Sequence, residues 1–245
     1  MSQALTDNLP LFDEAQHDIP NVLQEAFDTI SDAPNGIEKI RELILDLAVR
    51  GKLVPQDPSD EPASELLERV YAEKKRLIKE KIIRKPKRVP RLDPADAPWD
   101  APKGWAWTLM IHISERLGSG STPRGGKNAY VDNGIPFLRS QNVWNHGLDL
   151  SDVALIPESI HEKMSNTHVQ KQDILLNITG ASLGRCALVP GDLQAANVSQ
   201  HVTIIRLVEP EMRRYIHLSL LSPYVQGMVW GRQVGMAREG LSKKV

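Results

Sequence analysis

A proline-rich stretch divides this chain into two parts with different sequence patterns. Residues 84–103 contain the prolines Pro86, Pro90, Pro94, Pro98 and Pro102. Proline removes a backbone donor and restricts the residue before it, so a long helix cannot continue through this stretch. We therefore expect residues 84–103 to form an extended, fairly stiff linker between two domains.

The part before the linker has the pattern of amphipathic helices. Apolar residues recur at helical spacing in 22–30, 37–47 and 66–77, which predicts three helices separated by turns rich in Pro and Gly. Gly51 is expected to end the second helix, and the third is expected to begin near Pro62 and to run until Pro86 breaks it. The pattern predicts a flexible tail over residues 1–20 and a helical region over residues 21–83.

After residue 104, short apolar runs alternate with turns made of Gly, Asn, Asp and Pro. This alternation is typical of β-strands. The predicted strands are Trp107 to Ile113, Ile135 to Leu138, Val153 to Ile156, Ile174 to Ile178, Cys186 to Val189 and Val202 to Val208. Residues 215–230 predict a helix, which Pro223 would kink or restart. We therefore expect an α+β fold, with an N-terminal helical region followed by a mixed α+β domain over residues 104–245.

Charge is distributed unevenly along the chain. Residues 1–70 contain 5 Lys and Arg against 15 Asp and Glu, whereas residues 71–130 contain 14 against 6. An acidic segment repels a phosphate backbone and a basic one attracts it, so different partners are expected for the two segments. The single cysteine, Cys186, excludes an internal disulfide and fits a cytoplasmic location. We find no signal peptide and no apolar run that could span a bilayer.

One segment matches the nucleophile elbow of serine hydrolases in its residues but not in its context. Gly180 to Gly184 has the G-x-S-x-G spacing around Ser182, and Asp192 and His201 follow in the hydrolase order. The elbow requires a helix after the serine, but residues 185–189 predict a strand. A serine hydrolase therefore stays an unfavoured alternative.

A second segment has the glycines of a phosphate-binding loop but the wrong spacing. The loop from Gly120 to Asn128 is one residue too long, and Asn128 replaces the Ser or Thr that would hold Mg²⁺. We expect either a plain surface loop or one that carries Arg124 and Lys127 to DNA phosphates. The histidines form no metal-binding spacing, so we expect no metal site. The hydrolase and phosphate-loop signatures fail, and the chain also lacks the N/D-P-P-Y/F/W motif of amino-methyltransferases, so we expect no catalytic residue in it.

Polar side chains cluster where the predicted strands end. Arg, Gln and Asn have the paired donors and acceptors that match base edges in the major groove, and Ser, Thr and Gly suit phosphate contacts. Solvated loops are the competing interpretation, and Gln200 and His201 could equally be buried hydrogen-bonding residues. The candidates for base or groove contact are Arg139, Gln141 and Asn142; those for backbone contact or loop structure are Thr179, Ser182 and Arg185; the remaining DNA candidates are Gln200, His201, Gln233 and Arg238.

Two sets of motifs, in this order, resemble type I restriction-modification system specificity subunits. The run from Ile40 to Leu77 resembles their conserved helical region. Three later runs resemble a target recognition domain: Trp105 to Pro123, Gly134 to Val143 and Asp173 to Arg185. The resemblance implies a target recognition domain over residues 104–245 that reads double-stranded DNA at one half of a bipartite target.

The resemblance also implies partners. Helices of this kind hold the methyltransferase subunit, and the restriction subunit joins through the complex. S-adenosylmethionine, ATP and Mg are then expected on those partners and no cofactor on this chain. The docking residues implied are Ile40, Leu43, Ile44, Leu47, Leu66, Leu67 and Val70.

The chain departs from the family pattern in its length. Whole specificity subunits usually carry two recognition domains and two helical regions, whereas this chain has one of each and stops at Val245. We expect a fragment, a truncated chain or a half-length subunit that would self-associate. A recognition module of a fused restriction-methylation enzyme is the main alternative.

Overall fold

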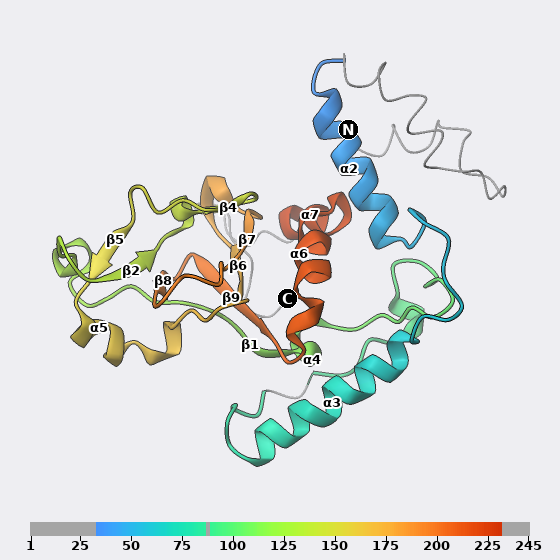
Figure 1. The fold of residues 1–245 in the computed structure, drawn as a ribbon, viewed down its shortest axis with the longest axis horizontal. Coiled ribbons are helices and arrows are strands. Elements are labelled where there is room, and N and C mark those ends of the chain that lie inside the picture. The colour runs from blue at the N-terminus through green and yellow to red at the C-terminus, as the bar shows by residue number, and fades with distance from the viewer. Residues whose placement is uncertain (1–32, 87–88, 232–245) are drawn as a thin grey trace. The chain divides into compact units, whose positions relative to one another are not determined.

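The computed structural model describes residues 33–86 and 89–231, and the chain divides into two compact units between Gln56 and Asp57 (Figure 1). The α-helices are α2 (Gly36–Val49), α3 (Ala63–Lys79), α4 (Met110–Ile113), α5 (Glu158–Lys163), α6 (Arg213–Leu221) and α7 (Pro223–Gly231). The strands are β1 (Ser114–Ser119), β2 (Ile135–Leu138), β3 (Val143–Trp144), β4 (Gly147–Leu148), β5 (Ala154–Ile156), β6 (Ile174–Asn177), β7 (Cys186–Leu188), β8 (Asn197–Val198) and β9 (Val202–Leu207). The fold is therefore α+β, as predicted. The predicted tail (1–20) and the first predicted helix (22–30) lie outside the described residues.

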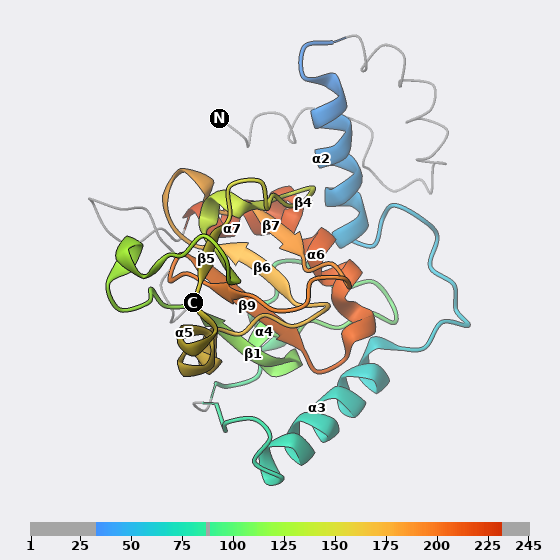
Figure 2. The same ribbon diagram turned by 60° about the vertical axis from the view of Figure 1, so that its left-hand side comes forward.

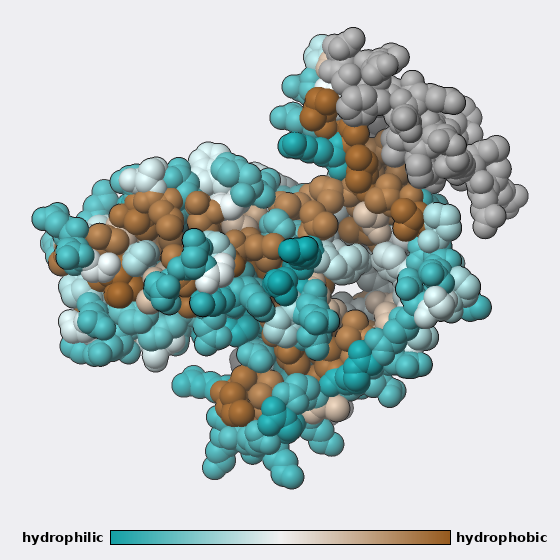
Figure 3. Space-filling view, viewed as in Figure 1, coloured by the Kyte–Doolittle hydropathy of each residue, from teal (hydrophilic) through white to brown (hydrophobic). Residues whose placement is uncertain are grey.

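Helix α2 makes up most of the described part of the N-terminal unit. The helix begins after Asn35, whose backbone lies in the left-handed region at φ 59°, which asparagine tolerates better than most residues. It ends at Arg50, and Gly51 follows with φ 66°, a common helix ending. The predicted end at Gly51 is confirmed. Hydrophobic and hydrophilic residues occupy different sides of α2, as its apolar spacing predicts (Figure 3).

Helix α3 carries opposite charges at its two ends. Glu65 lies in the first turn, and Arg76 and Lys79 lie in the last turn, which is the arrangement that the helix dipole favours. The helix ends at Lys79, earlier than the predicted break at Pro86.

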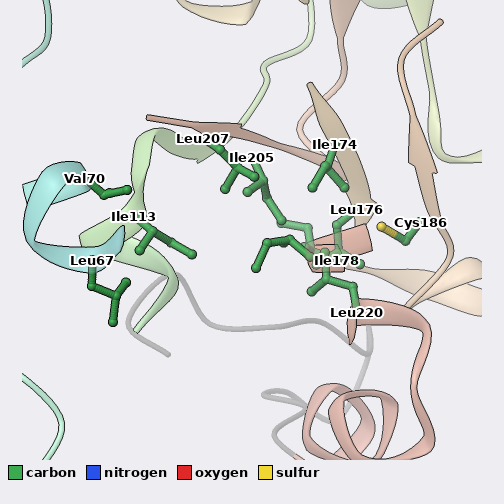
Figure 4. Close-up of a cluster of buried hydrophobic side chains, with 11 residues drawn as sticks. Leu67, Val70, Ile113, Ile174, Leu176, Ile178, Cys186, Ile205, Leu207 and Leu220 are labelled. Carbon is green, nitrogen blue, oxygen red and sulfur yellow. The ribbon is translucent and has the colours of Figure 1, made fainter. Parts of the chain in front are cut away.

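The apolar face of α3 packs into the core of the C-terminal unit. Leu67 and Val70 belong to a hydrophobic cluster that also contains Ile113 of α4 and residues of β6, β7 and β9 (Figure 4). Burying side chains of this size stabilises a fold by roughly 1.5–3 kcal/mol each. Consequently α3 belongs to the same unit as the strands, and the division falls inside the stretch 21–83 that was predicted as one helical region.

Lys74 connects α3 to α4 and the start of β1 through hydrogen bonds. Its ammonium group donates hydrogen bonds to the backbone carbonyls of Ile111 and Ser114. The residue is buried, and this burial lowers the pKa of its ammonium group. Lys74 therefore contributes to the fold rather than to a basic surface.

The residues predicted as a linker, 84–103, belong to the C-terminal unit. The ring of Trp99 packs edge to face on Trp107, with centroids 4.7 Å apart, and on Tyr224 at 4.6 Å. The Nε1–H of Trp107 donates to the carbonyl of Trp99 at 3.1 Å. Aromatic pairs of this geometry add about 0.5–1.5 kcal/mol beyond their buried area. Trp99 therefore anchors the end of this stretch on the C-terminal unit.

A four-stranded antiparallel sheet in the order β1-β9-β6-β7 is the centre of this unit. Side chains alternate between its faces, because successive residues of a strand point to opposite sides. Ile174 and Leu176 join the cluster beside α3, whereas Leu175 joins a second cluster with Ile204. Both faces are thus buried, which explains why the central strands β6 and β9 consist mainly of apolar residues.

A smaller sheet has the order β5-β2-β8, in which β2 and β5 are antiparallel and β2 and β8 are parallel. Strands β3 and β4 form a short hairpin. Its strand β4 lies beside β7 in both views (Figures 1 and 2). The hairpin therefore joins the larger sheet to the loops that leave the smaller one.

One predicted strand is wrong, and one predicted helix is divided in two. The run Trp107 to Ile113 is not a strand: its last residues form α4, and the strand that follows is β1. The predicted helix 215–230 is divided at Ser222, and Pro223 begins α7, so the predicted restart is confirmed. Among the described helices, none is long and apolar enough to cross a membrane.

Candidate nucleic-acid interface

The pairing of the strands brings distant polar segments together. Strands β2 and β8 run parallel with Leu138 opposite Val198, so the loops after both strands leave the smaller sheet side by side. In the larger sheet Asn177 at the end of β6 is opposite Val202 at the start of β9. The loops that follow β2, β6 and β8 therefore meet.

Hydrogen bonds between these loops confirm that they touch. The backbone N–H of Ile178 donates to the carbonyl of His201 at 3.0 Å. The side-chain amide of Asn177 donates to the carbonyl of Ser140 at 2.8 Å. The glycine-rich loop after β1 joins them through its own backbone bonds. We call residues 120–124, 139–142, 177–185 and 199–201 the polar loop cluster.

Gly120 allows the loop after β1 to lie close to the backbone of Val198 and Val202. Its N–H donates to the carbonyl of Val202 at 3.1 Å. A β-carbon at this position would lie 1.9 Å from the carbonyl oxygen of Val198, which is far inside van der Waals contact. Only glycine fits there without moving the backbone of the polar loop cluster.

A chain of side-chain hydrogen bonds crosses the cluster. The hydroxyl of Thr122 donates to Oε1 of Gln200, and Nε2 of Gln200 lies 2.9 Å from Nε2 of His201. An amide nitrogen only donates, so this ring nitrogen accepts and the ring proton sits on Nδ1. Nδ1 then donates to the hydroxyl of Thr179 at 2.6 Å. Of the predicted contact residues, Thr179, Gln200 and His201 are thus brought together, and Thr122 is one that the sequence did not single out.

Arg139 and Gln141 share one acidic partner. Nη2 of Arg139 donates to the carbonyl of Asp152 at 2.9 Å, and Nε2 of Gln141 donates to its carboxylate at 2.8 Å. The Arg139 guanidinium lies 3.8 Å from that carboxylate, whose side chain is 88% exposed. Gln141 is exposed and Arg139 is partly exposed, and both hold an existing contact that a base would have to replace.

Asn142 has a structural role instead of the predicted base contact. Only 2% of the residue is exposed. Its Oδ1 accepts from the backbone N–H of Arg139 at 2.9 Å, and its Nδ2 donates to the carbonyl of Asp149 at 2.9 Å. These bonds satisfy buried backbone groups of the turn after β2, so the side chain has no amide edge left to offer to DNA.

The Arg185 guanidinium lies on an indole ring. Its Cζ is 3.7 Å from the centroid of the Trp144 ring in the β3–β4 hairpin. The hairpin is tied to the same place, because Oδ1 of Asn145 accepts from the backbone N–H of Cys186 at 3.1 Å. Trp144 was not among the residues predicted from the sequence, because the candidates were all polar; an aromatic residue beside a two-residue turn was the available signal.

The structure does not assemble a hydrolase around Ser182. The residue closes a 3-10 turn, Gly180–Ser182, and the next regular element is strand β7 rather than a helix. Both ring nitrogens of His201 are already bonded to Thr179 and Gln200. The required context of a nucleophile elbow is therefore missing.

The remaining predicted DNA contacts are spread more widely. Arg124 and Lys127 are exposed in the loop before β2, where Gly125 and Gly126 have positive φ angles of 92° and 57°. A short 3-10 turn, Gly126–Ala129, stands where a phosphate-binding loop would need a helix. The predicted contacts Gln233 and Arg238 lie outside the described residues.

The predicted docking residues separate into two groups. Leu67 and Val70 are buried in the C-terminal core, and Leu66 packs against the same cluster, so these three hold the fold together and are not available to a partner. The others lie on α2 in the N-terminal unit, where Leu47 is buried and the rest are partly exposed. That second group consists of Ile40, Leu43, Ile44 and Leu47.

Comparison with curated proteins gives three type I restriction enzyme specificity subunits from Escherichia coli, while no family model matches. The chain is 58% identical to the EcoAI subunit over 80 residues, which are 33% of this chain and 14% of that protein. It is 56% identical to the EcoEI subunit over 79 residues, or 32% of this chain and 13% of that protein. It is 24% identical to the EcoBI subunit over 218 residues, or 86% of this chain and 39% of that protein. The chain thus spans less than half the length of the curated relatives that it matches.

Solved structures resemble the chain only distantly. A chain from a structure of type I restriction-modification complex assembly covers 96% of this chain and 46% of itself, with 15% identity and a TM-score of 0.41. The HsdS subunit from Thermoanaerobacter tengcongensis covers 80% and 43%, with 15% identity and a TM-score of 0.38. The S subunit from M. genitalium covers 55% and 30%, with 11% identity and a TM-score of 0.35. The relation therefore rests on the sequence matches, and by these the chain is a relative of type I restriction enzyme specificity subunits.

Proposed function

We propose that this chain recognises double-stranded DNA in a sequence-specific manner, as a specificity subunit of a type I restriction-modification complex. It reads one half of a bipartite target and has no catalytic centre of its own. The polar loop cluster is the reading surface. The names of the curated relatives support the assignment to this class of complex.

One observation supports the DNA-binding part of the proposal more than any other. Loops that follow four strands, β1, β2, β6 and β8, meet in one cluster and present donors and acceptors of the types that bind base edges and phosphates. Gln141 and Gln200 are exposed there, and Thr179 and Arg185 are partly exposed. Loops held on a rigid sheet are where binding residues are commonly found.

The partners follow from the same proposal. The apolar face of α2, made of Ile40, Leu43, Ile44 and Leu47, docks the methyltransferase subunit, and the restriction subunit joins through the complex. Methylation and cleavage are carried out by those subunits, which bind S-adenosylmethionine, ATP and Mg. The cytoplasmic location inferred from the single cysteine and the self-association of a half-length chain both stay predictions.

The test is a selection by the purified full chain from a pool of random duplexes. We expect a short motif to be enriched, because base-edge contacts discriminate by roughly 1–3 kcal/mol per pair. Arg124→Ala and Lys127→Ala should weaken binding to every duplex and each lower the salt slope by about 1. Lys39→Ala is the matched control, since Lys39 lies on α2 and pairs with Glu42. A pool that stays random after selection contradicts the proposal.

A further inference from the structure

We infer that Arg185 reads a guanine in the major groove and that Trp144 is the residue that positions it. The inference rests on the proposed function and assigns the chemistry of one contact. It differs from the expectation drawn from the sequence, which placed Arg185 among residues for backbone contact or loop structure and did not include Trp144.

The Arg185 guanidinium is uncommitted within the protein. Across the described ranges it makes no hydrogen bond and no ion pair, and the Trp144 ring is its one close partner. By contrast, Arg206 forms a two-pronged ion pair with the buried Asp173 through Nε and Nη2, each at 2.8 Å. Arg185 thus keeps five donors for an external acceptor.

The backbone of Arg185 and the ring of Trp144, between which the guanidinium is held, are both fixed by hydrogen bonds. The backbone of Arg185 donates to the carbonyl of Ser182 at 3.1 Å and accepts from the N–H of Asn177 at 2.9 Å. The Trp144 ring is held by its Nε1–H, which donates to the carbonyl of Gln141 at 2.9 Å. A donor group that is already ordered loses little conformational entropy on binding, which favours specific contacts.

Stacking determines which part of the guanidinium is free. The indole covers one face of the planar group, and all five N–H donors lie at its edge. The edge can donate two parallel hydrogen bonds, which match the O6 and N7 acceptors of guanine. Lysine cannot reproduce this geometry, because its ammonium is a point charge without a planar face.

The charge of the hairpin and of the loop after it favours a base over a phosphate. The hairpin, residues 143–148, contains no lysine or arginine, and the loop after it carries Asp149 and Asp152, of which Asp152 lies 3.8 Å from the Arg139 guanidinium. Two carboxylates disfavour a close approach of the phosphate backbone to this element. A two-stranded ribbon fits the major groove, where guanine presents O6 and N7. Together these features place Arg185 at a base edge.

The decisive experiment replaces single guanines in the selected duplex by 7-deazaguanine. This analogue keeps Watson–Crick pairing but removes the N7 acceptor. We expect one position at which the substitution weakens binding of the full-length chain by roughly 5- to 150-fold. Arg185→Ala should weaken binding to the normal duplex by a similar factor and should no longer distinguish the two bases at that position. Arg76→Ala is the control, because Arg76 is held by Glu73 and Glu80 on α3.

Variants of the ring test the positioning role. Trp144→Phe retains an aromatic face and should keep most of the discrimination between guanine and 7-deazaguanine. Trp144→Leu should lose it while binding to scrambled duplexes stays unchanged. If the leucine variant unfolds in a thermal melt, Arg185→Lys tests the planar geometry that the ring holds in place: loss of the discrimination is expected, and a lysine variant that keeps it contradicts the inference.

The outcomes separate this inference from the proposed function. If the wild-type chain selects a motif but Arg185→Ala distinguishes guanine from 7-deazaguanine as the wild type does, the inference is wrong and the proposed function stands. If Arg185→Ala weakens cognate and scrambled duplexes equally, the residue contacts phosphate and the inference is wrong. If the wild-type chain selects no motif, the proposed function itself fails.

Discussion

Neighbouring residues in the turn after β2 have opposite roles. Gln141 is exposed, whereas Asn142 beside it is buried and bonded to the backbone. Both have amide side chains of the kind that reads adenine, so their chemistry alone does not separate them. Their surroundings separate them, because a buried amide whose hydrogen bonds go to the backbone is not free to contact a base.

Replacing Asn142 should therefore destabilise the protein rather than alter its DNA preference. Asn142→Ala removes the acceptor of the Arg139 N–H and the donor to the Asp149 carbonyl. Leaving buried polar groups unpaired costs about 1–3 kcal/mol. Urea unfolding should show this loss, whereas the matched change Gln141→Ala should stay within about 0.5 kcal/mol. Equal stability of the two variants would contradict the structural role of Asn142.

Glu115 provides a prediction of pH dependence. Burial raises the pKa of its carboxyl group above the ordinary value of 4.5, and the attraction of Arg206 opposes this only in part. The contribution to folding from the protonated form is then fully present below pH 4.5 and is lost as the pH rises through the raised pKa. Near pH 7 Glu115→Gln should be more stable than the wild type, and the difference should fade as the pH falls towards 4.5. Urea midpoints at both pH values measure it, and a larger difference at the lower pH would contradict the assignment.

At the scale of elements, helix α3 shows that some residues predicted to dock a partner or to form a basic surface belong instead to the core of the C-terminal unit. Its apolar residues complete a core with α4 and the larger sheet, and its Lys74 is bonded inside the unit. The two helices resembled one docking region in sequence, because amphipathic spacing does not tell which surface covers the apolar face. The structure assigns the covering surface for α3, since Leu67 and Val70 are buried by residues of the same unit.

Equivalent substitutions on the two helices should consequently give different results. Leu67→Ala should lower the free energy of unfolding of the C-terminal unit by about 2–5 kcal/mol, since it leaves a cavity in the core. Leu43→Asp on α2 should leave the unfolding of that unit unchanged and should abolish co-purification with the methyltransferase. The two measurements are a urea titration and a pull-down from co-expressing cells. Leu43→Asp that still co-purifies would remove α2 from the docking role.

The two central strands of the larger sheet were predicted correctly because they are buried on both sides. Strands β6 and β9 are rich in apolar residues, since each face of the larger sheet meets a hydrophobic cluster. Strand β1 was missed, because it lies at the edge of the sheet and has the polar sequence SERLGS. The apolar run that precedes it predicts a strand, yet Met110–Ile113 form α4. Short apolar runs do not distinguish a strand from a buried helical turn.

Candidate site residues were predictable only as residue types at strand ends. That Thr179 and His201 would touch depends on the antiparallel pairing of β6 with β9, which brings the ends of distant segments together. The pairing of Arg185 with Trp144 depends on the side-chain amide of Asn145, a long-range bond without a local signal. The residue types of a binding site can therefore be predicted from the sequence, whereas which side chains come into contact depends on the sheet topology.

At the scale of the whole molecule, the division between Gln56 and Asp57 assigns opposite charges to two compact units. The N-terminal unit, residues 1–56, contains 4 Lys and Arg against 10 Asp and Glu, whereas the C-terminal unit, residues 57–245, contains 26 against 21. The acidic unit is disfavoured near a phosphate backbone, and the other unit contains the polar loop cluster. This separation is the physical basis for expecting one protein partner and one DNA partner.

The two units should therefore be separable in function. A fragment of residues 57–245 retains α3, both sheets and the hydrophobic clusters around them, so we expect it to fold and to select the same duplex motif as the full chain. Without α2 it should not co-purify with the methyltransferase. Circular dichroism and a thermal melt establish folding, and selection from random duplexes compares the motifs. The matched control is the full chain carrying Leu43→Asp, which should behave like the fragment in both assays. A folded fragment that selects a different motif, or none, would show that the N-terminal unit takes part in reading DNA, because the loops of the cluster are unchanged in it.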